Sequence, residues 1–410
     1  MKLTYLVQYY YPEKASGLQL VEDLLEGFAA HQWTVNVFTP TPTRGVTKEQ
    51  RKEYSVKRTE KRFNNYVVIN RMRLFREKDG FLQRTLRYLI FSIECFYKCI
   101  TFPSDFIFTG SGPPTQGAIA GFAKHFSKAT KVIYNLQDIF PDSLVTSGIC
   151  SSNSFLYKAG RKLEDYTYKH ADVIITISDE MKNNVLNKGV SPEKVEVVRN
   201  WIDTDKIRPI AREQNGLFEE LNLPRDKFYV VYAGNLGRVQ GVEILAAAAE
   251  NLLDRNDISF VIFGEGSEEQ HIKKLIEQLP NAKMFPLQSP ERISEVYSLG
   301  NVCVIPCKKG TAGSGMPSKT WSVMASGSAI IASFDRGGEM EDVLDKAACG
   351  VCVTAGDAQA LTEAILNLSN NQSLVKEMGN NARIYAERFC SKEKAVEQYI
   401  QIIENVVNEC

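Results

Sequence analysis

The sequence has 410 residues, which is enough for two or three domains with separate hydrophobic cores. Hydrophobic residues make up 44% and charged residues 24%, with 27 Gly and 15 Pro, so the composition excludes a disordered, collagen-like or low-complexity chain. The 49 basic and 49 acidic residues cancel. No overall field would attract a polyanion, and any site for one must be local.

The chain begins with MKLTYLVQYYYPEK, in which Gln8, the tyrosines and Pro12 interrupt a short apolar run. This pattern predicts a first strand and not a secretory signal. The longest apolar stretch elsewhere is residues 88–100, which contain Glu94 and Lys98 and fall short of the roughly 18 to 20 residues that span a bilayer. We therefore expect no membrane-crossing segment.

Short apolar runs alternate with amphipathic helical patterns in both halves of the chain. The runs are TYLVQYY, TVNVFTP, DFIFTGS, KVIYNLQD and DVIITIS in the first half, and FYVVYAG, SFVIFGEG, AKMFPL, VCVIPC and SAIIASF in the second. This rhythm of strand, helix and strand predicts parallel sheets that are covered on both faces. The predicted fold class is α/β, with two Rossmann-like doubly wound domains in tandem.

A polar, proline-punctuated segment separates the two halves, and we expect a hinge near residues 202–210. The last residues carry apolar side chains at helical spacing, from Ala395 to Val407. We predict an N-terminal domain over residues 1–205, a C-terminal domain over residues 206–387, and a terminal helix over residues 388–410 that packs back on the first domain.

The second half contains a series of motifs in a fixed order: VVYAGNLGRVQGVEIL, FVIFGEGSEEQ and GTAGSGMPSKTWSVMASGSAIIASFDRGGEMEDVL. With QYYYPEKASGLQLVEDLL, NLQDIFPDS and VRNWIDTDKIRP from the first half, they resemble the family 4 retaining glycosyltransferases. The resemblance implies a GT-B fold, in which two Rossmann-like domains face a cleft. It extends to bacterial members that build O-antigen and capsular polysaccharide, including transferases of N-acetylated amino sugars.

This resemblance implies a retaining hexosyltransferase that needs no metal and no cofactor. The donor would be a nucleotide diphosphate sugar, most often a UDP-sugar, and the acceptor a lipid-linked or growing saccharide. The first domain would bind the acceptor and the second the donor. Two alternatives remain open: a GT-B nucleotide-sugar epimerase, and a non-catalytic sugar-nucleotide-binding partner of another transferase.

Two loops of the second half carry the expected donor site. A glycine loop follows the strand FYVVYAG and includes Arg238, and a second loop leads into a helix whose first turn contains Lys319. A cation at a helix amino terminus is disfavoured unless an anion binds there, and a diphosphate would resolve the conflict. A solvated arginine and a lysine that reaches water are the structural alternatives. The predicted donor-binding residues are Gly17, Gly234, Asn235, Gly237, Arg238, Gly264, Pro286, Ser314, Gly315, Met316, Pro317, Ser318, Lys319, Ser322 and Glu339.

The family pattern places two glutamates around the second loop, and the equivalent positions here fall on Ser314 and Ser322. Gln240 stands where many members have a lysine. Glu339 and Glu341, which follow the strand SAIIASF, are candidates to supply the missing carboxylate. Ser318 is placed to cap the helix that follows the second loop.

Acceptor contacts are expected from the first domain. Glu13, Ser16 and Gly17 lie between the first strand and first helix, where small residues permit close approach. Asp138 ends a strand and would orient the acceptor hydroxyl or steady positive charge at the anomeric carbon. Asp142 competes for that role, and a turn or cap is the structural alternative for Asp138. Asp138, Arg238 and Lys319 are the predicted catalytic residues.

Metal-like spacings occur but do not predict a metal site. Asp203 and Asp205 imitate an Asp-x-Asp motif, yet they lie in the interdomain linker, where a turn and cap is the better interpretation. Cys303 with Cys307, and Cys349 with Cys352, fall in apolar strand-like runs where cysteine acts as a small hydrophobe. The four histidines occur singly, and no Ser-His-Asp set is evident.

From Arg44 to Cys99 the sequence has 15 basic and 6 acidic residues, a local excess of nine positive charges, and an aromatic amphipathic run follows over residues 81–102. This combination is typical of a surface that binds an anionic bilayer. No nucleic-acid-binding signature is present. We expect a cytoplasmic protein that lies at the inner face of the cell membrane.

Overall fold

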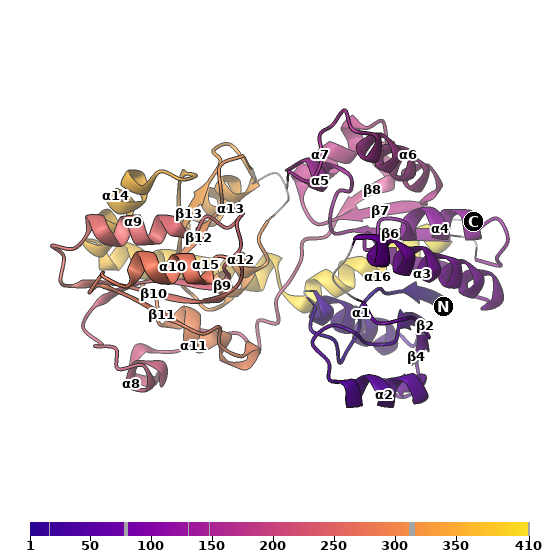
Figure 1. Cartoon of the computed structure of the whole chain (residues 1–410), viewed down its shortest axis with the longest axis horizontal. Helices are drawn as coiled ribbons and strands as arrows, with labels where there is room; N and C mark the ends of the chain where they lie inside the picture. The colour runs from indigo at the N-terminus through magenta and orange to yellow at the C-terminus, as the bar shows by residue number, and fades with distance from the viewer. Residues whose placement is uncertain (16, 78–80, 130, 147, 311–315, 409–410) are drawn as a thin grey trace. The chain divides into compact units, whose positions relative to one another are not determined.

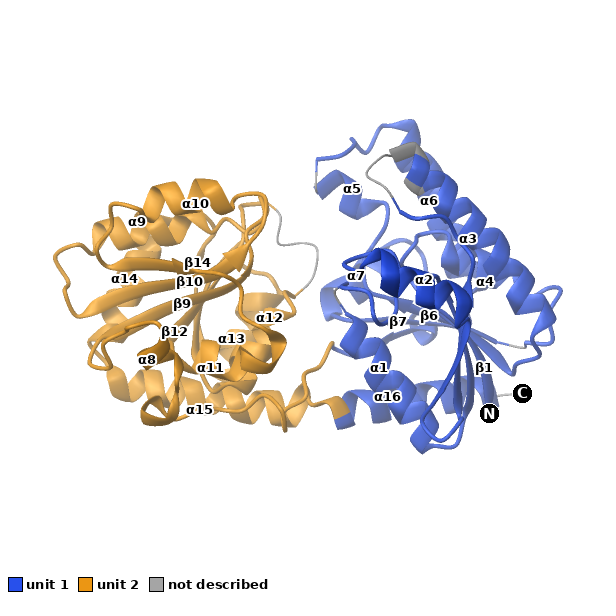
Figure 2. Ribbon diagram, turned by 60° about the horizontal axis from the view of Figure 1, so that its bottom comes forward, with its two compact units in different colours: residues 1–199, 393–410 blue, residues 200–392 orange. Residues whose placement is uncertain are grey.

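The computed structural model describes residues 1–15, 17–77, 81–129, 131–146, 148–310 and 316–408 (Figure 1). The chain forms two compact units: unit 1 consists of Met1–Arg199 with Glu393–Cys410, and unit 2 of Asn200–Lys392 (Figure 2). The expected return of the terminal helix to the first domain is thus observed. The boundaries fall at residues 199 and 393, instead of the predicted 205 and 388.

Unit 1 is built on an eight-stranded sheet in the order β3-β4-β2-β1-β5-β6-β7-β8. Every neighbouring pair is parallel except β3 with β4, which lie antiparallel at one edge. The strands are β1 Lys2–Leu6, β2 Thr34–Pro40, β3 Thr59–Arg62, β4 Val67–Met72, β5 Phe106–Gly110, β6 Lys131–Leu136, β7 Val173–Thr176 and β8 Val195–Val197.

Helices cover both faces of this sheet (Figure 1). On one face α16 packs tightly on α1: a methyl group added at Gly27 would lie 2.1 Å from Val396. Tyr399 of α16 also donates a 3.0 Å hydrogen bond to the side-chain oxygen of Asn135 on β6. The helices are α1 Leu18–Ala30, α2 Lys48–Val56, α3 Phe81–Thr101, α4 Gln116–Ala123, α5 Asp142–Thr146, α6 Phe155–His170, α7 Asp179–Asn187 and α16 Lys392–Asn408.

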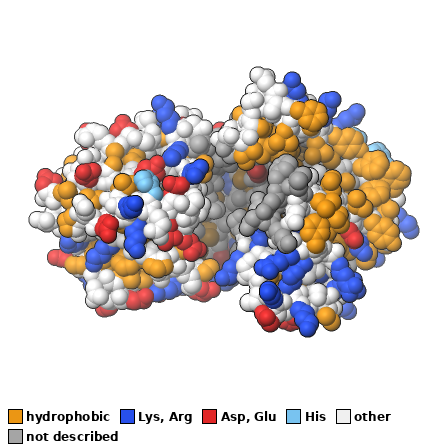
Figure 3. Space-filling view, in the orientation of Figure 1, with side chains coloured by type: hydrophobic (Ala, Val, Ile, Leu, Met, Phe, Trp, Pro, Cys, Tyr) orange, Lys and Arg blue, Asp and Glu red, His pale blue; other side chains and the backbone are white. Residues whose placement is uncertain are grey.

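The outer surface of α3 and α4 is apolar. Six large hydrophobic side chains, 46% to 68% exposed, form what we call the α3–α4 apolar patch: Leu86, Leu89, Ile93, Tyr97, Phe122 and Phe126. Figure 3 shows hydrophobic side chains gathered over these helices, with Lys and Arg side chains below them near α2. None of the described helices has the length and hydropathy needed to cross a membrane.

Unit 2 is built on a six-stranded parallel sheet in the order β11-β10-β9-β12-β13-β14. Side chains alternate along β9: Tyr229, Val231 and Ala233 enter one core cluster, whereas Phe228, Val230 and Tyr232 enter the other. A strand buried on both faces must be apolar at nearly every position, as FYVVYA is. The strands are β9 Phe228–Asn235, β10 Ile258–Glu265, β11 Ala282–Phe285, β12 Val302–Pro306, β13 Ala329–Phe334 and β14 Gly350–Thr354.

The helices of unit 2 divide between the two faces of its sheet. The core cluster that contains Trp321 gathers side chains from α11, α12, α13 and α15, and the opposite cluster gathers them from α9, α10 and α14. The bounds are α8 Leu217–Glu220, α9 Glu243–Asn251, α10 Glu269–Ile276, α11 Ile293–Ser298, α12 Lys319–Ala325, α13 Glu339–Ala347, α14 Ala358–Ser369 and α15 Gln372–Phe389.

The segment after the last strand of unit 1 is fixed to unit 2. The Arg383 guanidinium on α15 donates to the carbonyl oxygens of Thr204 at 2.9 Å and Ile207 at 2.7 Å. The Arg208 amide donates to Ser294 at 3.1 Å. Residues 202–210 therefore belong to unit 2, and the prediction of a hinge there is wrong: the chain passes between the units at Arg199 and Asn200.

Candidate functional site

The sheet of unit 2 reverses its winding at β9, which lies between β10 on one side and β12 on the other. In doubly wound sheets, ligands bind outside the carboxyl ends of the strands at this point. The loops that follow the two strands meet there: the Lys308 amide, after β12, donates a 3.0 Å hydrogen bond to the carbonyl oxygen of Val239, after β9. The candidate donor site is therefore the edge of unit 2 where β9 and β12 end.

Glycines bring the backbone strands of this edge unusually close together. Gly234 and Gly266 have φ values of +145° and +153°, which side-chain-bearing residues rarely adopt. A methyl group on Gly264 would lie 2.7 Å from the carbonyl oxygen of Gly234. The loop after β9 is tied to the loop after β10, since the Leu236 amide donates 2.8 Å to the carbonyl of Glu265. The predicted Gly234 and Gly264 thus lie side by side.

The ammonium group of Lys319 lies over Gly234. Its Nζ donates a 3.0 Å hydrogen bond to the phenolic oxygen of Tyr232, and Nζ is 2.7 Å from the position that a Cβ on Gly234 would occupy. The Tyr232 hydroxyl in turn donates 2.7 Å to the carbonyl of Asn235. Since Tyr232, Gly234 and Asn235 all belong to β9, the end of this strand positions the lysine from α12.

Lys319 is a half-buried cation, and among the described residues it has no acidic partner. Burial lowers the pKa of Lys319 from 10.5 to about 8, because the charged form is cut off from water. Among the described residues, Lys319 forms no ion pair, and Tyr232 is its hydrogen-bond partner. A cation that is partly removed from water in this way is unfavourable unless a counter-charge binds beside it. The arrangement is suited to bind an anion.

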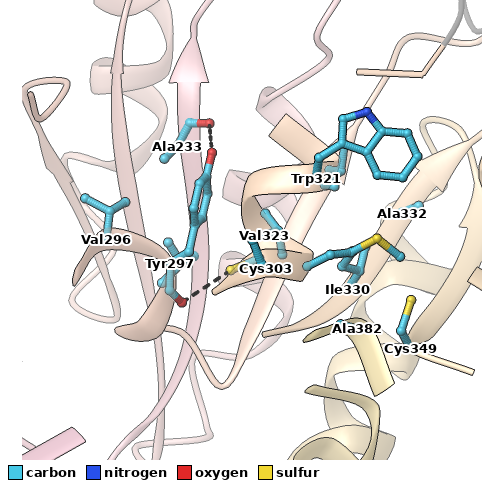
Figure 4. Close-up of a cluster of buried hydrophobic side chains, with 14 of the residues drawn as sticks. Ala233, Val296, Tyr297, Cys303, Trp321, Val323, Ile330, Ala332, Cys349 and Ala382 are labelled. Carbon is cyan, nitrogen blue, oxygen red and sulfur yellow. Dashed lines mark hydrogen bonds between the residues drawn. The ribbon is translucent and has the colours of Figure 1, made fainter. Parts of the chain in front are cut away.

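Core packing anchors the helix that carries this lysine. Trp321 and Val323 of α12 are 2% and 1% exposed and lie in the cluster drawn in Figure 4, beside Ile330 of β13 and Ala382 of α15. Thr320 is fully buried. Lys319, at the start of the helix, is consequently held by its neighbours in sequence as well as by Tyr232.

The structure places several predicted donor residues around α12. Ser318 occupies the N-cap position, but its side chain caps no amide, so the prediction of a capping serine is wrong. Ser322 is buried, and Met316 packs against the core cluster of Trp321. Pro317 precedes the helix, and its carbonyl accepts from the Thr320 amide at 2.9 Å. The predicted Ser314 and Gly315 lie outside the described residues.

Arg238 and Gly237 follow β9 as predicted. The Arg238 side chain is 85% exposed and forms a 3.3 Å ion pair with Glu268, after β10. Gly237 lies against Gln240 and Asn235, where a Cβ would meet their side chains at 2.6 and 2.9 Å. Arg238 is accordingly an exposed cation on a long side chain beside the site, whereas the Lys319 ammonium is held in place by Tyr232.

Pro286 and Glu339 follow two other strands at the same end of the sheet. Pro286 is exposed directly after β11, at the edge of the sheet, with β10 between β11 and β9. Glu339 opens α13 after β13, and both of its carboxylate oxygens are buried. Glu341, the alternative carboxylate, accepts from the Gly337 amide at 2.7 Å and pairs with Arg336. Glu341 is thus committed to its own loop.

In unit 1, the Glu13 carboxylate braces two loops. It is 2% exposed and accepts hydrogen bonds from the amides of Thr43 at 2.7 Å, Arg44 at 3.1 Å and Tyr10 at 3.4 Å. These contacts give Glu13 a structural role, and a role toward an acceptor stays a prediction. Gly17 has φ +75° before α1, with open space where a side chain would be. The predicted Ser16 lies outside the described residues.

The two aspartates after β6 differ in their surroundings. Asp142 is held by Lys188 at 2.7 Å, Tyr157 at 3.0 Å and Asn184 at 3.3 Å, and although burial opposes it, these bonds lower the pKa of Asp142. Asp138 keeps part of its surface exposed, yet the surrounding protein removes enough water to raise the pKa of its carboxyl. Asp142 is therefore structural, and Asp138 is the available carboxylate.

The metal-like spacings take the structural roles that the sequence favoured. The Asp203 carboxylate accepts from the amides of Asp205 at 3.1 Å and Lys206 at 2.9 Å, which confirms a turn and cap. Cys303 and Cys349 are buried free thiols. Across the part of the chain that the structure describes, no group of three His, Cys, Asp or Glu side chains is placed to hold a metal ion.

Two family models match the chain in succession. Residues 19–206 match the model "Glycosyltransferase Family 4", and residues 213–385 match "Glycosyl transferases group 1". The chain is also 28% identical to the putative colanic acid biosynthesis glycosyl transferase WcaI of Escherichia coli over 280 residues, 67% of each chain. It is 26% identical to the probable glycosyltransferase WbjE of Pseudomonas aeruginosa, over 57% of this chain and 59% of that relative.

Solved structures share the fold along the whole chain. Sucrose-phosphate synthase from Thermosynechococcus elongatus superposes with a TM-score of 0.74 at 18% identity, covering 100% of both chains. Anabaena HepE in complex with UDP superposes with a TM-score of 0.71 at 15% identity, covering 99% of this chain and 100% of that one. Together with the two family models, these likenesses show that the chain belongs to the glycosyltransferases of family 4 and has the GT-B fold.

Proposed function

We propose that this glycosyltransferase moves a hexosyl or N-acetylhexosaminyl unit from a nucleotide diphosphate sugar to a lipid-linked or growing saccharide acceptor. The observation that carries the proposal is the half-buried ammonium of Lys319, which lies over Gly234 and has no acidic partner among the described residues. A UDP-sugar is the proposed donor, in keeping with the UDP bound to HepE. The likeness to WcaI, a putative colanic acid transferase, supports a place in surface polysaccharide synthesis such as O-antigen or capsule.

In the proposed reaction an oxygen of the acceptor forms a bond to the anomeric carbon, and the bond from that carbon to the diphosphate breaks. The proton of the acceptor hydroxyl passes to the leaving diphosphate or to solvent. Negative charge develops on the leaving diphosphate, where a preorganised cation stabilises the transition state more than the ground state. Lys319 would supply a fixed positive charge. Arg238 would supply a second one after it leaves its ion pair with Glu268 and binds the diphosphate.

Asp138 would orient the acceptor hydroxyl or steady positive charge at the anomeric carbon. Two aspartates follow β6. Asp142 forms an ion pair with Lys188, whereas Asp138 forms no ion pair with the described residues. Membership in family 4 supports retention of the anomeric configuration. A metal ion is unnecessary in this scheme because the two cations can neutralise the diphosphate.

We further propose that the enzyme works at the inner face of the cell membrane. The α3–α4 apolar patch would enter the lipid, and exposed cations of the basic segment would face anionic headgroups, namely Lys48, Lys52, Lys57, Arg58 and Lys61. Arg51 and Arg62 do not belong to this set. Arg51 donates to backbone carbonyls, and Arg62 pairs with Glu22 at 2.6 Å.

The test is release of UDP from UDP-sugars by purified protein, with and without a bacterial lipid extract as acceptor. The proposal expects release that requires the extract and survives saturating EDTA. Interconversion of the sugar without an acceptor would identify an epimerase, and binding without turnover would identify a non-catalytic partner. Loss of activity in EDTA that magnesium or manganese restores would overturn metal independence.

A further inference from the structure

Three arginines of unit 1 gather beyond the carboxyl ends of β2 and β4. Arg51 of α2 donates to the carbonyl oxygens of Thr41 at 3.2 Å and Leu74 at 2.8 Å. Arg87 of α3 donates to the carbonyl of Phe75, the next residue. Because these acceptors follow β2 and β4, the two guanidinium groups are fixed at the end of the sheet where ligands of doubly wound domains bind. Arg76, the residue after Phe75, is exposed.

Part of this charge has no partner within the described structure. Arg87 is 2% exposed, and its Nη2 atom is buried without a hydrogen-bond partner among the described residues. Burial lowers the pKa of Arg51, and the positive charges of Arg87 and Arg76 lower it further, so the three charges repel one another. A purely structural role accounts for the bonds to the carbonyls. It does not account for three positive charges close together, or for the Nη2 atom of Arg87, which has no hydrogen-bond partner among the described residues.

The acidic residues nearby are already engaged. The Glu13 carboxylate accepts from backbone amides of Tyr10, Thr43 and Arg44. Glu77 pairs with the Arg44 guanidinium at 2.8 Å and accepts from the Tyr9 hydroxyl at 3.1 Å. Within the described residues, neither Arg51 nor Arg87 forms an ion pair. Glu13 and Glu77 act on these arginines through space, but the end of β2 and β4 still carries more positive than negative charge.

We propose that Arg51, Arg76 and Arg87 form a binding site for the phosphate groups of the acceptor, so that the acceptor is a saccharide or lipid joined through a diphosphate. This inference rests on the proposed function, because it names the chemistry of the acceptor that unit 1 would bind, whereas the donor is assigned to unit 2. Guanidinium groups bind phosphate oxygens in pairs through their planar fork, which lysines and amides do not reproduce. Arg76 would contact the ligand from the surface, and Arg51 and Arg87 would supply prepositioned charge beneath it.

Calorimetric titration of the full chain tests the site, with UDP at saturating concentration to occupy the donor site. The ligands are geranyl diphosphate, inorganic pyrophosphate and geraniol. Geranyl diphosphate should bind, and geraniol should bind at least tenfold more weakly. Arg76→Ala, which removes an exposed side chain, should weaken the binding of geranyl diphosphate at least tenfold. Lys158→Ala on α6 is the control, an exposed cation of the same unit, and should change affinity less than twofold.

Arg87→Lys keeps the positive charge but removes the planar guanidinium fork, and it should also weaken the binding of geranyl diphosphate about tenfold. The melting temperature of this variant shows whether it is folded. Equal binding by wild type, Arg76→Ala and Arg87→Lys would overturn the proposal. Pyrophosphate that binds as tightly as geranyl diphosphate, with the same losses, would assign the site to free diphosphate. If UDP fails to bind while geranyl diphosphate responds to these variants, the proposed donor function fails and the phosphate site stands.

Discussion

The ammonium nitrogen of Lys319 lies 3.0 Å from the phenolic oxygen of Tyr232, and the two residues come from different elements, α12 and β9. The same hydroxyl donates to the carbonyl of Asn235, so its one proton is used there and its lone pair accepts from the lysine. Nζ also lies 4.2 Å from the centre of the tyrosine ring. Tyr232 thus fixes the position of the charge that we assign to the donor diphosphate.

Replacing Tyr232 by Phe should loosen this charge without removing it. The variant loses two hydrogen bonds and leaves the Asn235 carbonyl and the Lys319 ammonium without that partner, at a cost of about 1 to 3 kcal/mol in the free energy of unfolding. UDP should bind several-fold more weakly, because Lys319 is no longer prepositioned. Urea unfolding and UDP titration measure the two effects. Tyr229→Phe is the control on the same strand, since its hydroxyl donates to the carbonyl of Pro224, away from the site.

Replacing Lys319 by Met should stabilise the protein in the absence of ligand. The pKa of Lys319 is about 8 in the folded protein against 10.5 unfolded, so at pH 7 the desolvation of this half-buried charge costs up to roughly 3 kcal/mol. Between pH 8 and 10.5 the unfolded chain holds more protons, and the stability of the wild type should rise with pH relative to the variant. Urea unfolding at several pH values measures this difference.

Lys308→Met is the control for that experiment. Lys308 also follows β12 near the site, but its side chain is 49% exposed and lies 3.4 Å from Glu243. The stability of this variant should follow the wild type at every pH. A Lys319→Met protein that is less stable than the wild type at pH 7, or a difference that does not depend on pH, would contradict the presence of a desolvated charge without a counter-charge.

The two aspartates after β6 should separate catalysis from stability. Asp142→Asn removes the negative charge that Lys188 pairs with and one of the two oxygens that accept from Lys188 and Tyr157, so it should lower the free energy of unfolding by roughly 1 to 3 kcal/mol. Asp138→Asn should leave stability nearly unchanged, because no ion pair among the described residues depends on it, and should lower kcat, because we propose that it orients the acceptor hydroxyl. Thermal unfolding and initial rates of both variants decide the assignment. Equal kcat for Asp138→Asn and the wild type would remove Asp138 from the reaction.

The α3–α4 apolar patch should carry membrane binding. Ile93→Ser and Phe126→Ser remove side chains that are 68% and 62% exposed, so they should weaken sedimentation with anionic vesicles without affecting folding. Raising salt should weaken binding further, because screening shortens the reach of the surface charges to about 10 Å at 0.1 M. Ile384→Ser on α15, 58% exposed, is the control. Vesicle binding that is unchanged in both patch variants would exclude the patch.

The sequence predicted the architecture because hydrophobic periodicity and glycine placement act locally. Strands such as β9 are apolar at nearly every position, and Gly234 marks the turn where the backbone approaches a neighbour. The chain crossing at Arg199 was missed because residues 202–210 look like a loop in sequence. Their attachment to unit 2 depends on Arg383, which lies far along the chain.

The site was predicted only in part, for the same reason. Lys319 was predicted because a cation at the start of a helix conflicts with the helix dipole. In the sequence Tyr232 is indistinguishable from any other strand residue, and only the fold places its hydroxyl beside the lysine. The basic segment was predicted to be a membrane surface as a whole. Arg51, Arg71 and Arg87 are in fact directed at backbone carbonyls, a pairing that charge counting along the sequence does not detect.

Titration of UDP into the wild type and into Lys319→Met tests the central claim most directly, with the Lys308→Met protein as the charge-matched control. Losing one preorganised, desolvated cation should cost about 2 to 4 kcal/mol, so UDP should bind the Lys319→Met protein roughly 30-fold to 1000-fold more weakly. The same variant should be folded and more stable than the wild type without ligand. UDP affinity that is the same within twofold in the wild type and Lys319→Met would contradict the assignment of this lysine to the donor diphosphate.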